Sequence, residues 1–198
     1  NFFGGCENML VNFFNDHRLQ ENFTLSLSYR AGSVYVEGLR KRLKQQPREQ
    51  GLALLNEDWL SHLVERLPRV LAVALRSLQS LLLLRYWILA LNVIRLTQYW
   101  KTQQIDLLHI NNGGYPGASS CRAAAIAARI LRIPHTIMVV NNIATYPRLH
   151  ERLIEKLISK LIGCSVQAFV TGSNFATLAL KERLPDSTAS FLSLHNGI

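Results

Sequence analysis

Three short polar segments contain the side chains that best suit ligand binding, and each directly follows an apolar run. They are Asn111-Asn112-Gly113-Gly114-Tyr115, Asn141-Asn142 and Gly172-Ser173. Asparagine amides both donate and accept hydrogen bonds, which suits neutral polyols such as sugars, and glycines let a ligand approach the backbone. Each segment taken alone is more typical of a turn than of a binding site. The predicted site therefore depends on a fold that brings the three segments together.

A glycine pair at the start of the chain is a second candidate. Gly4-Gly5 directly precedes a helical pattern that begins at Glu7. A turn of this kind can hold a phosphate, because the first N–H groups of a helix have no partner within the helix, or a sugar that approaches the backbone closely. A bare Gly-Gly pair is more typical of a simple turn. The GxGxxG and GxxxxGK[ST] nucleotide-binding patterns do not occur, nor does the GxSxG nucleophile pattern. No catalytic residue is therefore assigned.

Three titratable residues could lie near the first polar segment in the fold. His109 falls inside a predicted strand, where a buried, hydrogen-bonded histidine is the more usual outcome. Asp106 and Glu7 could reach the same rim of the fold, although their spacing does not pair them.

The three cysteines do not suggest a metal site. Cys6, Cys121 and Cys164 are far apart, and they form neither a CxxC pair nor a Cys/His ligand pattern. This arrangement disfavours structural zinc and a disulfide framework, and it fits a reducing compartment. We expect no metal and no cofactor.

The charge of the chain predicts an anionic partner. There are 22 Lys and Arg residues against 13 Asp and Glu, a formal charge of +9. Nucleic acid, an acidic bilayer and phosphorylated substrates would all be attracted. A basic loop over residues 40–48 is more typical of a solvated face, but it could touch phosphate headgroups. It has no interleaved aromatic residues, so nucleic-acid binding is not expected.

The most apolar stretch, residues 67–100, predicts two helices rather than a membrane span. Arg76 and Arg85 interrupt it, whereas a spanning helix needs about 20 apolar residues. Two polar stripes can be traced along it, and on one straight helix they would lie on nearly opposite sides, so a break near Ser80 is expected. The stripes are Arg69, Arg76 and Gln79, and Arg85, Asn92 and Arg95. Residues 1–6 lack the basic and apolar regions of a signal peptide.

The remaining pattern alternates strands with helices and predicts an α/β fold. We expect a Rossmann-like parallel sheet with right-handed crossovers, helices on both faces and one domain over residues 1–198. The loops that follow parallel strands emerge on one rim, where ligands bind, and this rim would collect the three polar segments. The expected strands are 23–29, 52–55, 105–110, 135–140, 166–171 and 190–194, and the expected helices are 7–16, 118–132, 148–162 and 174–183.

Four short motifs, taken in order, resemble the N-terminal domain of GT-B fold glycosyltransferases of the retaining family 4. Gly4-Gly5-Cys6-Glu7 is similar to the G-G-x-E turn of that family, and Asp106-Leu107-Leu108-His109 to its D-hydrophobic-hydrophobic-H strand. Val170-Thr171-Gly172-Ser173 resembles the strand that ends in serine. His195-Asn196-Gly197-Ile198 resembles the N-G-I-D element that opens the link to the second domain. The resemblance covers nearly the whole chain, and the order of the motifs is more specific than any one of them.

The resemblance implies that this chain is the acceptor-side half of a two-domain enzyme. The C-terminal domain would hold an NDP-sugar donor, with Gly4, Gly5 and Glu7 near its phosphates and Asn196-Gly197 starting the linker. Members of the family are generally metal-independent. The implied enzyme is bacterial and transfers a sugar, with retention, to a glycan or lipid-linked acceptor in polysaccharide biosynthesis. It would be cytoplasmic and peripheral on the inner face of the membrane.

The sequence departs from the family pattern in three places. It begins at the glycine turn and stops at the linker, so the first strand and the donor domain are expected to be absent and the fragment alone inactive. Asn111 stands where many members have a second histidine, so no catalytic histidine is assigned. A non-catalytic, basic membrane-surface module is the alternative function, and a nucleic-acid binder is favoured by charge alone.

Overall fold

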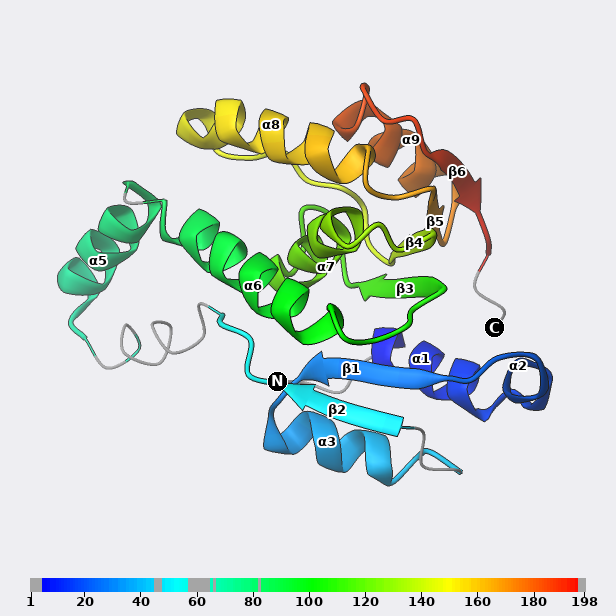
Figure 1. The fold of residues 1–198 in the computed structure, drawn as a ribbon. Coiled ribbons are helices and arrows are strands. Elements are labelled where there is room, and N and C mark those ends of the chain that lie inside the picture. Colours follow the sequence, from blue (N-terminus) through cyan, green and yellow to red (C-terminus); the bar gives the residue numbers. More distant parts are fainter. Residues whose placement is uncertain (1–4, 45–47, 57–64, 66, 82, 196–198) are drawn as a thin grey trace. The chain divides into compact units, whose positions relative to one another are not determined.

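The computed structural model describes residues 5–44, 48–56, 65, 67–81 and 83–195 (Figure 1). By their internal contacts the residues fall into two compact units, 1–54 and 55–198. The single domain expected over residues 1–198 stays a prediction, and each unit is described by itself.

The first unit is a small α/β arrangement around a two-stranded parallel sheet. Strand β1 pairs with β2 from Ser26 opposite Arg48 to Arg30 opposite Leu52. Val11, Phe14, Leu27 and Leu39 form its buried core. The elements are α1 (Gly5–Asn15), α2 (His17–Asn22), β1 (Ser26–Arg30), α3 (Ser33–Arg40) and β2 (Arg48–Leu52).

The second strand of this unit lies earlier than the sequence predicts. The expected strand over residues 52–55 is wrong, because β2 ends at Leu52 and its partners on β1 lie opposite residues 48–52. The predicted basic loop over 40–48 is also partly ordered as secondary structure. Arg40 ends α3 and pairs with Glu49 at 2.7 Å, and Lys41 pairs with Glu37 at 2.6 Å. Part of the basic charge is thus balanced within the unit.

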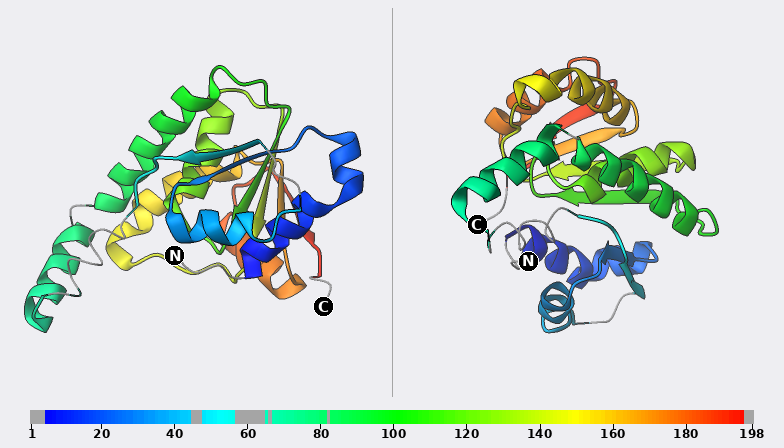
Figure 2. Two further views of the ribbon diagram at one scale, coloured as in Figure 1. Left: turned by 90° about the horizontal axis from the view of Figure 1, so that it is seen from below. Right: turned by 90° about the vertical axis from the view of Figure 1, so that its left-hand side faces the viewer.

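The second unit is built on a four-stranded parallel sheet with the strand order β3-β4-β5-β6. Each strand is connected to the next by a helix, as the alternating sequence pattern predicts, and Figure 2 gives two further views of these strands and helices. The strands are β3 (Leu107–Asn112), β4 (His135–Val140), β5 (Ala168–Thr171) and β6 (Ser190–Ser193). The helices are α5 (Arg69–Leu81), α6 (Leu84–Trp100), α7 (Ser119–Ile130), α8 (Arg152–Gly163) and α9 (Asn174–Arg183), with a 3-10 turn at Leu149–Glu151.

One face of this sheet is buried over its first three strands. Ile110, Met138 and Phe169 lie in register across three strands and are buried, and α7 packs on β3 and β4. On the other face Leu107 and Leu192 are exposed. The parallel α/β architecture is therefore confirmed, and helices on both faces stay a prediction.

Helix α7 corrects one expectation about its faces. From the sequence alone, its alanines lie on the side away from Arg122 and Arg129, so a polar side with both arginines exposed is expected. Ala123 and Ala127 are fully buried, as expected, and Arg129 is exposed, but Arg122 is only 1% exposed. A carboxylate on another helix, described below, explains the buried guanidinium.

The break predicted in the apolar stretch 67–100 is confirmed. Helix α5 ends at Leu81 and α6 begins at Leu84, with Leu83 in the left-handed region at φ 52°. Helix α6 then packs along α7. None of the helices in the described ranges has the length and apolar character needed to cross a membrane.

Candidate functional site

The four parallel strands end level with one another. Asn112 lies opposite Val140, Val140 opposite Thr171, and Thr171 opposite Ser193. Their carboxyl ends therefore form a straight edge, and the loops that follow β3, β4 and β5 leave from it together. This is the edge at which ligands bind in parallel α/β sheets.

The first two polar segments contact each other at this edge. The Asn141 Nδ2 donates to Asn111 Oδ1 at 2.9 Å and to the Asn112 carbonyl at 3.0 Å. Gly114 lies beside Asn142, because a Cβ built on Gly114 would come 3.5 Å from the Cβ of Asn142. Both asparagines of the first segment belong to β3, so the strand expected over 105–110 extends to Asn112 and the loop begins only at Gly113.

The second and third polar segments line one hollow of about 450 Å³. None of its lining side chains is charged, so its polar surface consists of amides, a hydroxyl and backbone. Such a surface suits a neutral polyol. The lining residues are Asn141, Asn142, Ile143, Gly172, Ser173 and Ala176.

Ser173 has a structural task in addition to its place in the hollow. It is the N-cap of α9, and its Oγ accepts a hydrogen bond from the Ala176 N–H at 3.2 Å. The Ser173 carbonyl accepts from Thr171 Oγ1 at 3.1 Å. The serine therefore fixes the angle at which β5 passes into α9.

Replacing Ser173 by alanine should lower the free energy of unfolding by about 1 kcal/mol, because the Ala176 N–H loses its acceptor. Urea denaturation followed by circular dichroism would measure this loss. Ser173→Thr keeps an oxygen at the same place and serves as the control. Equal stability of the alanine variant and the parent would contradict the capping role.

The first polar segment contributes no residue to the lining of the hollow. The side chains of two of its members are turned inward, so the assignment of those two to the cleft is wrong. Asn112 is fully buried, and its Oδ1 accepts from the Ala118 N–H at 3.3 Å near the start of α7. Tyr115 is 2% exposed and donates from its hydroxyl to Ser159 Oγ at 3.0 Å. Its peptide bond to Pro116 is cis. Both side chains are turned inward because they hold the β3–α7 loop against α7 and α8.

The remaining predicted site residues lie at the carboxyl edge, at the opposite edge of the sheet, in the first unit or outside the described residues. Gly113 is exposed at the carboxyl edge without a neighbour within 4 Å of a Cβ built there. Asp106 precedes β3 and therefore lies at the opposite edge, so the expectation that it shares the rim is wrong. Gly5 and Glu7 belong to α1 in the first unit, and the structure does not describe the surroundings of either residue. Gly4, Asn196 and Gly197 lie outside the described residues as well.

His109 lies within β3, as expected. Burial lowers the pKa of its imidazole, which favours the neutral form at neutral pH. Among the described residues no group of three His, Cys, Asp or Glu side chains could hold a metal ion. Cys121 and Cys164 are free thiols.

No protein-family model, curated protein or solved structure matches this chain. The resemblance to family 4 glycosyltransferases therefore depends on the sequence motifs alone and stays a prediction.

A buried ion-pair network that no sequence motif predicted lies behind the sheet's covered face. Arg122 of α7 pairs with Glu155 of α8 at 2.8 Å, and Arg85 of α6 reaches the same carboxylate at 2.5 Å. Arg85 also pairs with Glu151 at 3.1 Å. Its one indication in the sequence is an arginine, Arg122, within an alanine-rich helix.

The network fixes the charge state of its central carboxylate. Burial alone would raise the pKa of Glu155, but the guanidiniums of Arg122 and Arg85 outweigh burial and lower it. Burial also raises the pKa of the neighbouring Tyr86, so its phenol stays neutral. Glu155 and its partners thus connect three helices that position the sheet.

Proposed function

We propose that this chain is the acceptor-side, Rossmann-like half of a retaining GT-B glycosyltransferase of family 4. The complete enzyme transfers a sugar from an NDP-sugar to a glycan or lipid-linked acceptor at the inner face of a membrane. The observation that carries the proposal is the uncharged hollow at the carboxyl edge, where Asn141, Asn142, Gly172 and Ser173 come together. The order of the sequence motifs supports the same family.

The hollow offers binding and positioning rather than acid–base chemistry. Its amides can donate to and accept from acceptor hydroxyls, and exposed Asn142 presents its side chain to solvent there. The N-terminus of α9 opens beside Ser173, and a helix N-terminus favours negative charge such as a donor diphosphate. In the transfer, the acceptor hydroxyl oxygen forms a bond to the anomeric carbon as the bond to the diphosphate breaks, and the hydroxyl proton passes to the departing diphosphate. Holding the reactants in place accounts for much of the acceleration in such a reaction.

The decisive experiment measures sugar transfer by the complete protein that contains this chain. A panel of NDP-sugars is supplied with membrane-extracted glycolipid acceptors, and release of nucleoside diphosphate is followed. Turnover with at least one donor is expected. Absence of turnover across the panel, with the protein folded, would refute the enzymatic proposal and leave the non-catalytic membrane module.

Replacing Asn142 by alanine should weaken acceptor use about 2- to 12-fold in kcat/KM, because a hydrogen bond contributes roughly 0.5–1.5 kcal/mol. The side chain is exposed, so the stability of the fold should not change. Gln98→Ala removes an exposed amide from α6 and is the matched control. Equal losses in both variants would show that Asn142 has no specific part in acceptor binding.

A further inference from the structure

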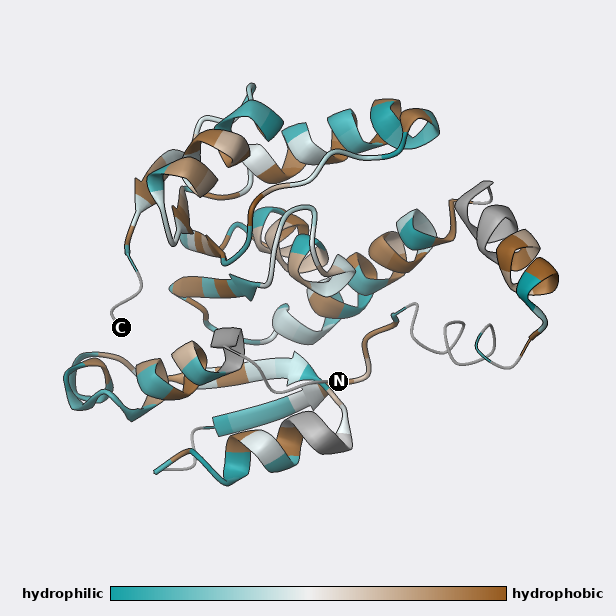
Figure 3. Cartoon of the chain, turned by 180° about the vertical axis from the view of Figure 1, so that it is seen from behind, coloured by the Kyte–Doolittle hydropathy of each residue, from teal (hydrophilic) through white to brown (hydrophobic). Residues whose placement is uncertain are grey.

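Helix α8 carries an exposed row of leucines on its outward side. Leu153, Leu157 and Leu161 follow one another at intervals of four residues and are 74%, 64% and 39% exposed. Leu149, one turn earlier, is 75% exposed. The opposite side of α8 is buried through Glu155, Ser159 and Ile162, so the leucines cannot be part of the unit's core. Figure 3 shows hydrophobic and hydrophilic residues together along this helix.

A row of cations runs beside the leucines. Arg152, Lys156 and Lys160 are exposed and also follow at intervals of four residues. Each of them precedes a leucine by one position, so on a helix the two rows lie about 100° apart. Within the described parts of the chain, none of the three has an ion pair. The face therefore presents apolar side chains next to unbalanced positive charge.

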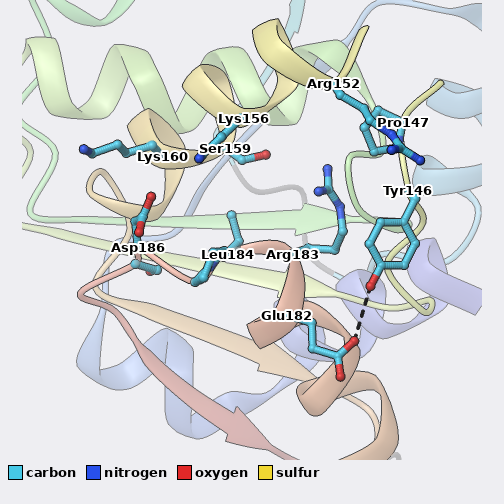
Figure 4. Close-up of a pocket in the computed structure, with 12 residues that line it drawn as sticks. Tyr146, Pro147, Arg152, Lys156, Ser159, Lys160, Glu182, Arg183, Leu184 and Asp186 are labelled. Carbon is cyan, nitrogen blue, oxygen red and sulfur yellow. Dashed lines mark hydrogen bonds between the residues drawn. The ribbon is translucent and has the colours of Figure 1, made fainter. Parts of the chain in front are cut away.

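The same cations line a pocket of about 390 Å³ between α8 and the end of α9 (Figure 4). Arg183 of α9 is a fourth cation there, and its guanidinium lies over the ring of Tyr146 at 5.5 Å. Two carboxylates, Glu182 and Asp186, also line the pocket. Glu182 accepts a hydrogen bond from the Tyr146 hydroxyl at 3.3 Å. Four cations against two carboxylates leave the pocket positive.

We propose that α8 docks on an anionic phospholipid surface. The leucine row enters the boundary between headgroups and acyl chains, and the cation row with its pocket binds headgroup phosphates. Helices that lie in a membrane interface combine these two features, an apolar face with Lys and Arg beside it. An uncharged surface would leave the cations without partners, and a purely charged partner would leave the leucines in water. The inference rests on the membrane location in the proposed function and is independent of sugar transfer.

Vesicle sedimentation with the 198-residue chain tests the proposal. Vesicles of phosphatidylcholine alone are compared with vesicles of phosphatidylcholine and phosphatidylglycerol in equal parts. Binding is expected to the anionic vesicles and to fall with added salt, because salt screens the attraction. Failure to bind the anionic vesicles, or equal binding to both kinds, would overturn the proposal.

Two sets of variants assign the binding to α8. The triple variant Arg152→Gln, Lys156→Gln, Lys160→Gln should lower the partition coefficient by on the order of a hundredfold. Its control removes three exposed cations elsewhere, with Lys44→Gln, Arg69→Gln and Lys101→Gln. Because both variants lose the same net charge, a much smaller loss in the control is expected, and equal losses would refute a local site.

The leucines are tested with Leu153→Gln and Leu157→Gln together, against Leu71→Gln and Leu91→Gln on other exposed helices. Only the α8 pair should abolish binding, with unchanged thermal unfolding in both. The main rival explanation is that this face is a dimer interface, and light scattering of the parent and of the α8 double variant tests it. A parent dimer that dissociates in the double variant would overturn the lipid proposal. Vesicle binding without turnover would refute sugar transfer alone, whereas turnover on soluble acceptors without vesicle binding would refute this inference alone.

Discussion

Replacing Arg122 by leucine is expected to lower the free energy of unfolding of the unit 55–198 by about 3–5 kcal/mol. Glu155 is fully buried and would keep only Arg85 as a cationic partner in this network. A buried carboxylate that loses a charged partner keeps the cost of its desolvation, which is why breaking such a pair is costly. Urea denaturation of both proteins would measure the difference.

The control is Lys156→Gln, one position from Glu155 on the exposed side of α8. It should change the stability by no more than about 0.5 kcal/mol. If Arg122→Leu were as stable as this control, the ion pair would not be a determinant of the fold.

The same pair predicts how stability depends on pH. The pKa of Glu155 in the folded chain lies below its ordinary value of 4.5. The unfolded chain therefore binds the proton first as pH falls, so the contribution of Glu155 is complete above its ordinary pKa and is lost below it. The parent should lose more stability than Arg122→Leu as the pH falls below about 4.5.

Replacing Gly117 by alanine is expected to cost about 2–5 kcal/mol, from a strained backbone and a steric clash together. Gly117 has φ +65°, and a Cβ there would lie 2.2 Å from both the Asn112 Oδ1 and the Gly114 carbonyl oxygen. Asn112 is fully buried. Thermal or urea unfolding would show the loss.

Gly113→Ala is the matched control, four positions earlier in the same loop. A Cβ at Gly113 meets nothing within 4 Å, so this variant should stay within about 0.5 kcal/mol of the parent. Similar effects of the two substitutions would show that the tight approach at Gly117 does not limit the fold.

The sequence predicted the second unit closely because its signals are local. The strand over 135–140 and the helix over 174–183 have the predicted bounds, since turn residues and apolar runs mark both ends. The strands of the first unit were harder to predict. Strand β2 contains Glu49 and Gln50 and little apolar pattern, so its position depends on pairing with β1, which no local signal reveals.

The candidate site could be predicted in its position and only partly in its residues. Parallel strands place their following loops on one edge, and the structure brings Asn111, Asn141 and Asn142 together there with Gly172-Ser173. The inward turn of Asn112 and Tyr115 could not be read from spacing. Their directions depend on partners on α7 and α8, the Ala118 N–H and Ser159.

The carboxylate of Glu155 has a consequence for how this unit opens. The carboxylate belongs to α8 and pairs with guanidiniums from α6 and α7. None of the three helices can therefore detach without breaking an ion pair with another of them. Their backbone amides should consequently exchange with deuterated solvent through one shared opening event rather than helix by helix. In such an experiment the slowest amides of α6, α7 and α8 would report the same opening free energy.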